Sequence, residues 1–477
     1  MNNTTTAKIG LFGIGLDIYW EQFEGLKDRL TGYLNVVADG IKANGATLIN
    51  LGLIDNVDKA FEAGDILKRE DVDLIFLYVS TYALSATVLP VVRKAGVPVI
   101  VLNLSPEARI DYKWFNSLND RTKMTGEWLA NCSACPVPEI ANVFKRCNIP
   151  FHQVTGMLHS DAAVWKEIEE WIEAAQVARV LNYNRMGLMG NYYGGMLDIY
   201  TDLTAITATL GGHFEIIEVD YLSALRESVT KNEIADKVKE IHEAFDVQND
   251  CAADEIERAA ITAVALDKMV AHYKLSSFAY YHKGKGNPAN ENTMSSVILG
   301  NSLLTGHNVP VAGEYEVKNA IAMKIMDTFG AGGSFTEYYA MDYTDDVVLM
   351  GHDGPCHPRI AEGKIKVKPL KVYHGKVGRG LSVEMSVKNG DVTLLSVIEG
   401  DNGRMKLLIA EGESVAGEIL EIGNTNSRYR FPLGAKGFVE AWNQHGPAHH
   451  CAVGKGHITS KLKKMASILN IDCIQIC

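Results

Sequence analysis

The first 155 residues alternate short apolar runs with amphipathic stretches. Apolar runs that predict buried strands lie at residues 8–12, 47–51, 74–77 and 97–102. Between them, apolar residues recur at helical spacing over residues 23–44, 56–66 and 82–95. Strands that alternate with helices in this way predict a parallel sheet covered by helices on both faces.

A second series of the same kind begins near residue 182. Its pattern predicts strands at residues 185–189, 214–219 and 275–281, and helices at residues 197–210, 231–245 and 254–273. Residues 152–178 connect the two series, and part of this connection has the pattern of a helix. A second parallel-sheet domain is therefore expected.

After about residue 330 the pattern changes to short β-rich runs, at residues 365–372, 381–387, 392–398 and 404–410. Asn389-Gly390 and Asp401-Asn402-Gly403 separate some of these runs and predict hairpin turns, because Asn and Gly tolerate positive φ. A helix at residues 460–469 and a strand at 472–476 are predicted to close the chain. The expected fold class is α/β: two Rossmann-like parallel-sheet domains, residues 1–178 and 179–330, and then a β-rich, antiparallel, barrel-like C-terminal domain, residues 331–477.

Composition narrows the classes of function. The 477 residues are 47% hydrophobic and 22% charged, which is typical of folded domains and excludes a disordered chain. The net charge of −12 repels phosphate backbones, so no nucleic-acid partner is expected. The chain has no run of 18 apolar residues, and its first residues lack the pattern of a signal peptide. We therefore expect no membrane partner and a cytoplasmic location.

Eight cysteines are scattered along the chain, and in a long chain without an export signal they are expected to be reduced thiols. Cys132-Ser-Ala-Cys135 has the spacing of a redox pair or of half a zinc site. Because no second Cys-x-x-Cys is present, we interpret this pair as structural thiols.

Glycine-rich turns follow predicted strands at residues 10–15 and 187–195. Neither reads as Gly-x-Gly-x-x-Gly with an acid about twenty residues further on, which favours tight turns over a nucleotide site. Lys283-Gly-Lys-Gly286 has the composition of either an anion site or a solvated loop. Tyr280 and Tyr281 come just before it, after a predicted strand, and are candidate walls of a ligand pocket.

The strongest candidate chemistry lies between residues 312 and 357 and near residue 450. Glu314, Glu337 and His352 each lie on a short segment with glycine neighbours, and His449-His450 follows about a hundred residues later. Two carboxylates with imidazole suit Mn²⁺, Mg²⁺ or Co²⁺ better than structural zinc, which prefers thiolates. Taken singly, each of these residues is equally typical of an ordinary surface or core position.

The order of these residues resembles the L-arabinose isomerase family, within the L-arabinose/L-fucose isomerase group. The matching stretches are Gly-Glu-Tyr-Glu-Val-Lys-Asn-Ala (313–320), Gly-Gly-Ser-Phe-Thr-Glu-Tyr-Tyr (332–339), Val-Leu-Met-Gly-His (348–352) and Ala-His-His (448–450). The resemblance implies a divalent metal, usually manganese, held by Glu314, Glu337, His352 and His450, with the two glutamates as the catalytic pair. It leaves open whether His449 or His450 reaches the metal. It also implies a homo-oligomer, trimeric or hexameric, with sites built from neighbouring subunits.

The chain departs from arabinose isomerases where they bind sugar. His352 is followed by Asp353-Gly354-Pro355 in place of the usual Met-Leu-Glu, and the N-terminal sugar-binding stretch is replaced by residues 15–20, which include Tyr19. We expect an altered substrate pocket that includes Tyr19, Tyr281, His449 and Asp353.

The predicted function is a metal-dependent aldose–ketose isomerase in carbohydrate metabolism, acting on L-arabinose or a related sugar. Proton transfer through an enediol and a metal-assisted hydride shift both remain open. The alternatives are a non-catalytic intracellular sugar-binding or sensor protein and a nicotinamide-dependent sugar oxidoreductase.

Overall fold

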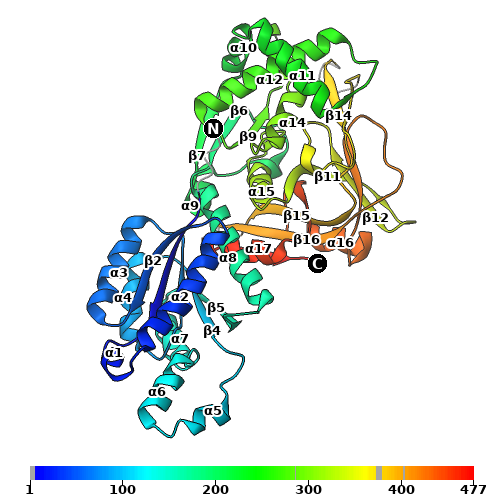
Figure 1. The fold of residues 1–477 in the computed structure, drawn as a ribbon. Helices are drawn as coiled ribbons and strands as arrows, with labels where there is room; N and C mark the ends of the chain where they lie inside the picture. The colour runs from blue at the N-terminus through cyan, green and yellow to red at the C-terminus, as the bar shows by residue number, and fades with distance from the viewer. Residues whose placement is uncertain (1–5, 285, 372–378, 401–402) are drawn as a thin grey trace. The chain divides into compact units, whose positions relative to one another are not determined.

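The computed structural model describes residues 6–284, 286–371, 379–400 and 403–477. The chain folds as two compact units, Met1–Val180 and Leu181–Cys477 (Figure 1). The first unit holds one parallel sheet, and the second holds another parallel sheet together with a β-barrel. The predicted fold class is therefore confirmed, whereas the division into three domains stays a prediction.

The sheet of the first unit has the strand order β2-β1-β3-β4-β5, and all neighbouring strands are parallel. Its strands are β1 (Lys8–Ile14), β2 (Thr47–Ile54), β3 (Leu74–Tyr78), β4 (Val99–Ser105) and β5 (Phe151–Met157). One face packs on α3 (Val57–Glu70), α4 (Leu89–Ala95) and α7 (Val137–Arg146), while α2 (Leu26–Ala43) packs against β1 and β2. This is a doubly wound order, with its crevice between β1 and β3.

Two elements of the first unit differ from their predictions. The helix predicted at residues 82–95 begins only at Leu89, because Pro90 lies in its first turn, where proline starts helices. Strand β5 was not predicted, since it is an edge strand in which His152, Gln153 and Thr155 are exposed and interrupt any apolar run.

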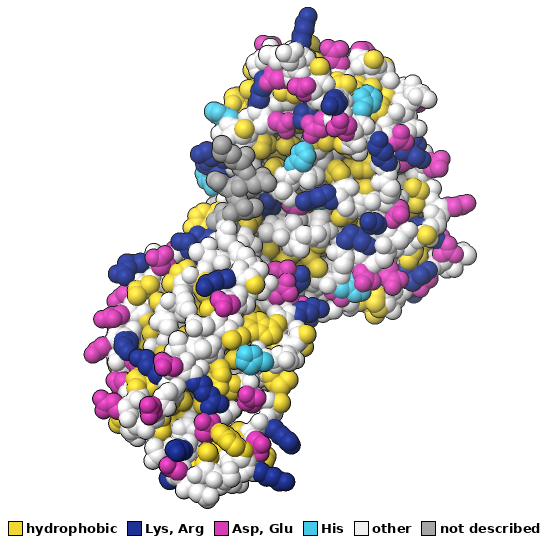
Figure 2. All heavy atoms as spheres, viewed as in Figure 1, with side chains coloured by type: hydrophobic (Ala, Val, Ile, Leu, Met, Phe, Trp, Pro, Cys, Tyr) yellow, Lys and Arg dark blue, Asp and Glu magenta, His cyan; other side chains and the backbone are white. Residues whose placement is uncertain are grey.

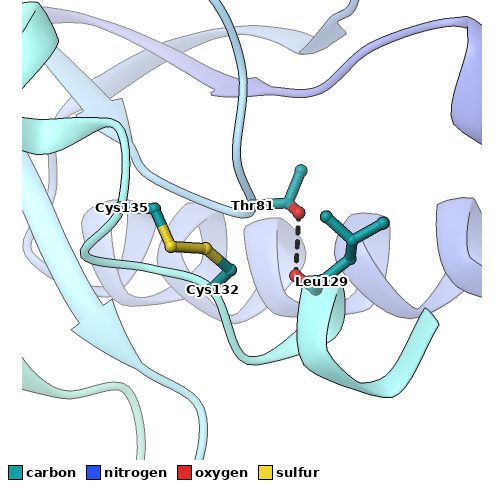
Figure 3. The surroundings of a disulfide bond; sticks show 4 residues. All are labelled: Thr81, Leu129, Cys132 and Cys135. Carbon is teal, nitrogen blue, oxygen red and sulfur yellow. Dashed lines mark hydrogen bonds between the residues drawn. A yellow bond between two sulfur atoms is a disulfide. The ribbon is translucent and has the colours of Figure 1, made fainter. Parts of the chain in front are cut away.

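Cys132 and Cys135 form a disulfide (Figure 3). The expectation that every cysteine is a reduced thiol is therefore wrong for this pair. The turn between α6 (Arg121–Ala130) and α7 brings the two Cα atoms to 5.9 Å, within the range that a disulfide requires. Beside it, Thr81 Oγ1 donates a hydrogen bond of 2.7 Å to the carbonyl of Leu129, which ties the end of α6 to the loop after β3. The other six cysteines are free thiols.

The second unit begins with a four-stranded parallel sheet of order β10-β9-β6-β7. Its strands are β6 (Arg185–Gly190), β7 (His213–Ile217), β9 (Ser277–Tyr281) and β10 (Val311–Ala312). Helices α10 (Val219–Glu227), α12 (Ala253–Tyr273) and α14 (Ile298–Gly306) pack on this sheet. The strand order reverses between β6 and β9, so a ligand crevice is expected at the carboxyl ends of these strands.

The helix predicted at residues 197–210 is broken into a short 3-10 turn, η2 (Leu197–Ile199), and helix α9 (Leu203–Leu210). Asp202 causes the break, because its side chain accepts hydrogen bonds from the backbone of Thr204 and Ala205 and starts a new helix.

The C-terminal part is a closed antiparallel barrel. Its strands, in order around the barrel, are β15 (Gly390–Glu399), β18 (His450–Lys455), β11 (Gly332–Asp342), β12 (Val347–His352), β17 (Thr425–Arg430) and β16 (Met405–Val415). Pairing of β15 with β16 closes the barrel, and β19 (Asp472–Gln475) adds to β16 in parallel. Helix α15 (Val317–Thr328) contacts β9, β10, β11, β15 and β18, and its residues 317–327 are buried. It therefore connects the parallel sheet to the barrel as a core helix.

The two predicted hairpins have different outcomes. Strands β15 and β16 pair as a hairpin on either side of residues 401–403, although residues 401–402 lie outside the described part of the chain. Asn389-Gly390 does not join a hairpin. Strand β14 (Leu381–Glu384) pairs instead with β13 (Lys366–Pro369) in a separate small sheet with β8 (Asp246–Val247), and residue 372 of the run predicted there is outside the described residues.

The surface carries charges of both signs. On the face drawn in Figure 2, acidic and basic side chains are interspersed. Within the described residues, no helix is both long and apolar enough to cross a bilayer.

Candidate metal centre

Glu314 lies two residues after the end of β10, at the carboxyl edge of the second parallel sheet. Glu314 and Tyr315 both have positive φ, 56° and 64°, a conformation that costs free energy in residues other than glycine and is concentrated at functional sites. Two backbone hydrogen bonds hold this turn, from Tyr315 to the carbonyl of Tyr280 (3.0 Å) and from Glu316 to the carbonyl of Gly313 (2.9 Å).

Three further side chains come from neighbouring strands of the barrel. Glu337 on β11 is paired with His450 on β18 and, on its other side, with Gly351 on β12, next to His352. The backbone amide of His352 donates to Thr425 Oγ1 (2.9 Å), and the Thr425 hydroxyl donates to the His352 carbonyl (2.9 Å). The ring of Phe335 contacts both imidazoles, with centroids 4.5 Å from His352 and 4.3 Å from His450. These contacts orient both rings.

The sheet-edge glutamate and the barrel residues converge. His450 Nε2 lies 3.4 Å from Glu314 Oε2, and His352 Nε2 lies 4.0 Å from Glu314 Oε1. Two sets of potential ligand atoms lie within 4.8 Å of one another, one from Glu314, His449 and His450, and the other from Glu337, His352 and His450. His450 belongs to both sets.

Burial shifts the pKa values of two candidate ligands, His450 and Glu314. Burial, reinforced by the neighbouring rings of His352 and His449, lowers the pKa of His450 well below 6.5, so its ring is neutral. Burial also raises the pKa of Glu314, while the two imidazoles oppose this shift. Among the described residues, Glu314 Oε2 and both ring nitrogens of His450 are buried without a hydrogen-bond partner. Unsatisfied donor atoms of this kind fit a divalent cation.

The C-terminal part of the chain is similar to one known family. Residues 332–472, which contain β11, β12 and β18, match the family model of the L-arabinose isomerase C-terminal domain. This match supports membership of the arabinose isomerase family. No curated protein matches the chain. Of the candidate ligands, Glu337, His352 and His450 lie within the matched residues, and Glu314 precedes them.

Two acidic residues that were not predicted as site residues contact the histidines of this site. Asp198 Oδ2 lies 2.6 Å from His449 Nδ1, and Glu316 Oε2 lies 3.6 Å from His450 Nδ1. Glu316 is fully buried, and burial raises its pKa to about 8. Glu316 lies within the stretch that carries the family resemblance, whereas Asp198 lies in a predicted helix, where no sequence signal distinguished it.

The predicted sugar-binding residues are placed differently from one another. His449 Nε2 faces Glu314 Oε2 at 3.8 Å and Glu337 Oε2 at 4.0 Å. Asp353 follows His352, and its backbone carbonyl lies 2.7 Å from His352 Nδ1. Tyr281 ends β9 and packs on Tyr193 with ring centroids 4.6 Å apart. Tyr19 belongs to the first compact unit, where it packs on Trp20 and Phe23. All four sugar contacts stay predictions.

Proposed function

We propose that this chain is a metal-dependent aldose–ketose isomerase that acts on L-arabinose or a related sugar. One observation carries the proposal. Glu314 from the edge of a parallel sheet meets Glu337, His352 and His450 from three strands of an arabinose isomerase-type barrel, and the buried donor atoms of Glu314 and His450 lack partners among the described residues.

The donor set suits a divalent cation, most of all Mn²⁺, with Mg²⁺ or Co²⁺ as substitutes. Glu314, Glu337, His352 and His450 would hold it. When bound, the ion supplies Lewis acidity toward the sugar carbonyl and a template for adjacent sugar oxygens.

The two glutamates perform the proton transfers. One removes the proton from C2 of the aldose, which produces an enediol, and returns a proton to C1; the other moves the hydroxyl proton from O2 to O1. The sugar is isomerised with no net oxidation. Their surroundings support separate roles, because the side chain of Glu314 is 17% exposed and that of Glu337 is 31% exposed.

The substrate is a neutral sugar, consistent with a chain of net charge −12 that would repel polyanions. Tyr281, His449 and Asp353 contact the sugar, and a sugar contact by Tyr19 stays a prediction. The family resemblance supports a trimer or hexamer. A cytoplasmic location stays a prediction.

The decisive experiment is to remove metal with a chelator, restore Mn²⁺, and assay a panel of pentoses and deoxyhexoses. We expect activity to disappear with the chelator, to return with Mn²⁺, and to be lost in Glu314→Gln. The matched control is Glu243→Gln on α11 (Lys231–Ala244), whose side chain is 68% exposed. Activity that survives both the chelator and Glu314→Gln would exclude the proposal.

The same reaction in D₂O separates the two mechanisms. Proton transfer through an enediol brings solvent deuterium to carbon, whereas a hydride shift keeps the original hydrogen. We expect deuterium at C1 of the ketose.

The two alternative functions predict different experimental results. Sugar binding of equal affinity with and without Mn²⁺, and no turnover, would indicate a binding protein. A nicotinamide cofactor would need a free acid near the end of β2, but Asp55 there accepts hydrogen bonds from Trp20 Nε1 (2.9 Å) and Lys59 Nζ (2.6 Å). We therefore expect no stabilisation by NAD(P).

A further inference from the structure

His449 and His450 are adjacent in sequence but lie in different surroundings. The side chain of His450 is fully buried, whereas that of His449 is 35% exposed. Their rings are in contact, with centroids 3.8 Å apart and planes tilted by 42°. His449 is therefore the histidine of this pair that a sugar can reach.

Asp198 holds His449 at two points. Its Oδ2 accepts one hydrogen bond from the backbone amide of His449 (2.9 Å) and a second from ring nitrogen Nδ1 (2.6 Å). Because a carboxylate only accepts hydrogen bonds, Nδ1 must be the donor in this pair. The remaining ring nitrogen, Nε2, is then free to accept in the neutral ring.

Asp198 is itself anchored. It lies on η2, between β6 and α9, and its backbone carbonyl accepts a hydrogen bond of 2.9 Å from Lys318 Nζ on α15. Lys318 is 6% exposed, so this hydrogen bond holds η2 against α15, the core helix that begins just after the turn of Glu314. His449 is thus oriented from outside the barrel, by a residue more than two hundred positions earlier in the chain.

The contact with Asp198 turns the other ring nitrogen of His449 toward the two glutamates. With Nδ1 turned to Asp198, Nε2 lies 3.8 Å from Glu314 Oε2 and 4.0 Å from Glu337 Oε2, between the two carboxylates that are proposed to move protons. A sugar hydroxyl in this space would meet Nε2 in one fixed tautomer.

We propose that Asp198 is a positioning residue of the isomerase site, which holds His449 so that Nε2 hydrogen-bonds a substrate hydroxyl while His450 remains the metal ligand. This inference rests on the proposed function for its kinetic consequence, and on geometry alone for the orientation of the ring. Asp198 acts only through His449.

The test compares Asp198→Ala, Asp198→Asn and His449→Ala in the Mn²⁺-loaded full-length protein. Asp202→Ala is the matched control, because it removes the cap of α9 and loosens the same connection without touching His449. We expect Asp198→Ala to lower kcat by about 10- to 100-fold, as loss of an orienting partner does. Asp198→Asn, which keeps an acceptor oxygen, should recover most of this loss, and Asp202→Ala should change kcat less than about twofold.

Two readouts separate positioning from general damage. Calorimetry should give a Mn²⁺ dissociation constant within about threefold of the wild type for Asp198→Ala, because the proposal assigns the metal to His450 and not to His449. The double variant Asp198→Ala/His449→Ala should lose no more activity than His449→Ala alone, because Asp198 acts only through His449. Fully additive losses of kcat in the double variant, or a loss in Asp202→Ala as large as that in Asp198→Ala, would overturn the proposal.

Binding of an open-chain polyol, measured by calorimetry, makes the test independent of turnover. If no sugar is isomerised but Asp198→Ala and His449→Ala weaken polyol binding equally and non-additively, the proposed function fails and the positioning role stands. If sugars are isomerised and Asp198→Ala leaves both kcat and polyol affinity unchanged, the positioning role fails and the proposed function stands.

Discussion

Glu337 and His450 are direct cross-strand partners in the barrel, on β11 and β18. The opposite neighbour of Glu337 is Gly351 on β12, which places His352 one residue further along that strand. Strand pairing therefore brings together three candidate ligands that are separated by up to 113 positions (450 − 337), and the register of β11, β12 and β18 determines the geometry of the site.

Gly351→Ala is expected to damage stability and metal binding together. A Cβ at this position would overlap the carbonyl oxygen of Thr425, the residue whose hydroxyl accepts from the His352 amide and donates to the His352 carbonyl. Overpacking of this kind costs about 1–3 kcal/mol. Urea unfolding and Mn²⁺ calorimetry should both show a loss. Gly32→Ala, on an exposed turn of α2 with no atom within 4 Å of the added Cβ, is the control and should be neutral or stabilising. Wild-type Mn²⁺ affinity in Gly351→Ala would contradict the prediction.

Glu316→Gln is expected to separate metal affinity from stability. The Glu316 carboxyl group faces His450 Nδ1 at 3.6 Å, just beyond hydrogen-bond distance. Carboxyl groups in this position orient a ligand imidazole, so we expect its replacement to weaken metal binding by about 10- to 100-fold. Burial raises the pKa of Glu316 to about 8, which means that its charged form is costly in the metal-free protein. Calorimetry should show weaker Mn²⁺ binding, while the metal-free variant unfolds at no lower urea concentration than the wild type. Unchanged Mn²⁺ affinity would remove Glu316 from the site.

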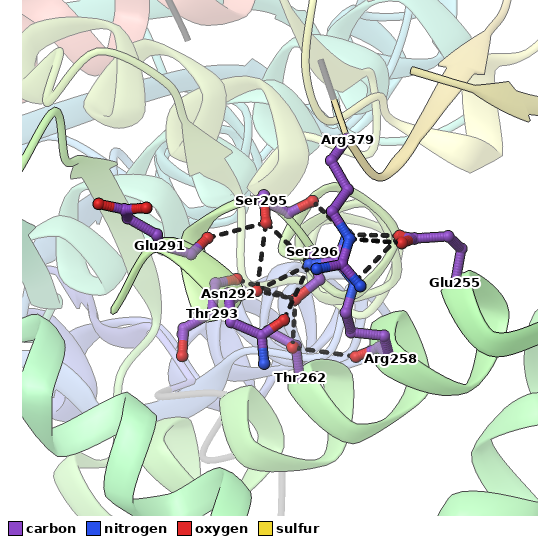
Figure 4. A network of polar contacts seen from close by, with 9 residues as sticks. All are labelled: Glu255, Arg258, Thr262, Glu291, Asn292, Thr293, Ser295, Ser296 and Arg379. Atoms are coloured by element: carbon purple, nitrogen blue, oxygen red, sulfur yellow. Dashed lines mark hydrogen bonds and ion pairs between the residues drawn. The ribbon is translucent and has the colours of Figure 1, made fainter. Parts of the chain in front are cut away.

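Glu255→Gln is expected to destabilise the second unit at neutral pH but not in acid. Arg258, which is 7% exposed, donates hydrogen bonds to Glu255, to the Asn292 carbonyl and to Ser295 (Figure 4). Arg379 donates a further hydrogen bond to Glu255. Burial alone would raise the pKa of Glu255, but the two arginines outweigh it and lower the pKa below 4.5.

A lowered folded-state pKa means that Glu255 contributes stability above pH 4.5 and loses this contribution as the pH falls through the folded-state value. At pH 7 the variant should lose about 1–3 kcal/mol, because buried Arg258 loses a charged partner. Urea unfolding across pH should show this difference shrink in acid. A difference that stays constant with pH would contradict the assignment, and Glu243→Gln serves as the control.

Cys135→Ser is expected to cost the first unit roughly 2 kcal/mol. The disulfide with Cys132 closes a very short loop, and the chain-entropy model assigns a contribution of this size to such a closure. Cys135 is exposed, so serine there leaves the packing of buried Cys132 intact. Urea unfolding should show the loss, and a dithiol reductant should bring the wild type to the level of the variant. Cys147→Ser, at an exposed free thiol, should have no effect. A wild type that is insensitive to the reductant would contradict the prediction.

The parallel sheets were largely predictable because their central strands are continuous apolar runs. All five residues of β3 are buried, and their hydrophobic pattern predicted this strand directly. Edge strand β5 escaped prediction because only its inner residues need to be apolar. The connection from η2 to α9 was read as one helix, since the spacing of its apolar residues does not reveal that Asp202 caps a new one.

The sequence by itself determined the fold class, the β-rich character of the last third and the identity of the four candidate ligands, since each depends on local patterns or short motifs. Only the tertiary structure decided which side chains meet. Asp198 and His449 are 251 residues apart, and their contact follows from α15 holding η2 against the start of β18. No local pattern encodes such a contact, because it depends on strand register and helix packing between distant segments. The exposure of His449 and the burial of His450 were also decided by the tertiary structure, since His449 lies in the bend before β18 and His450 is the first residue of that buried strand.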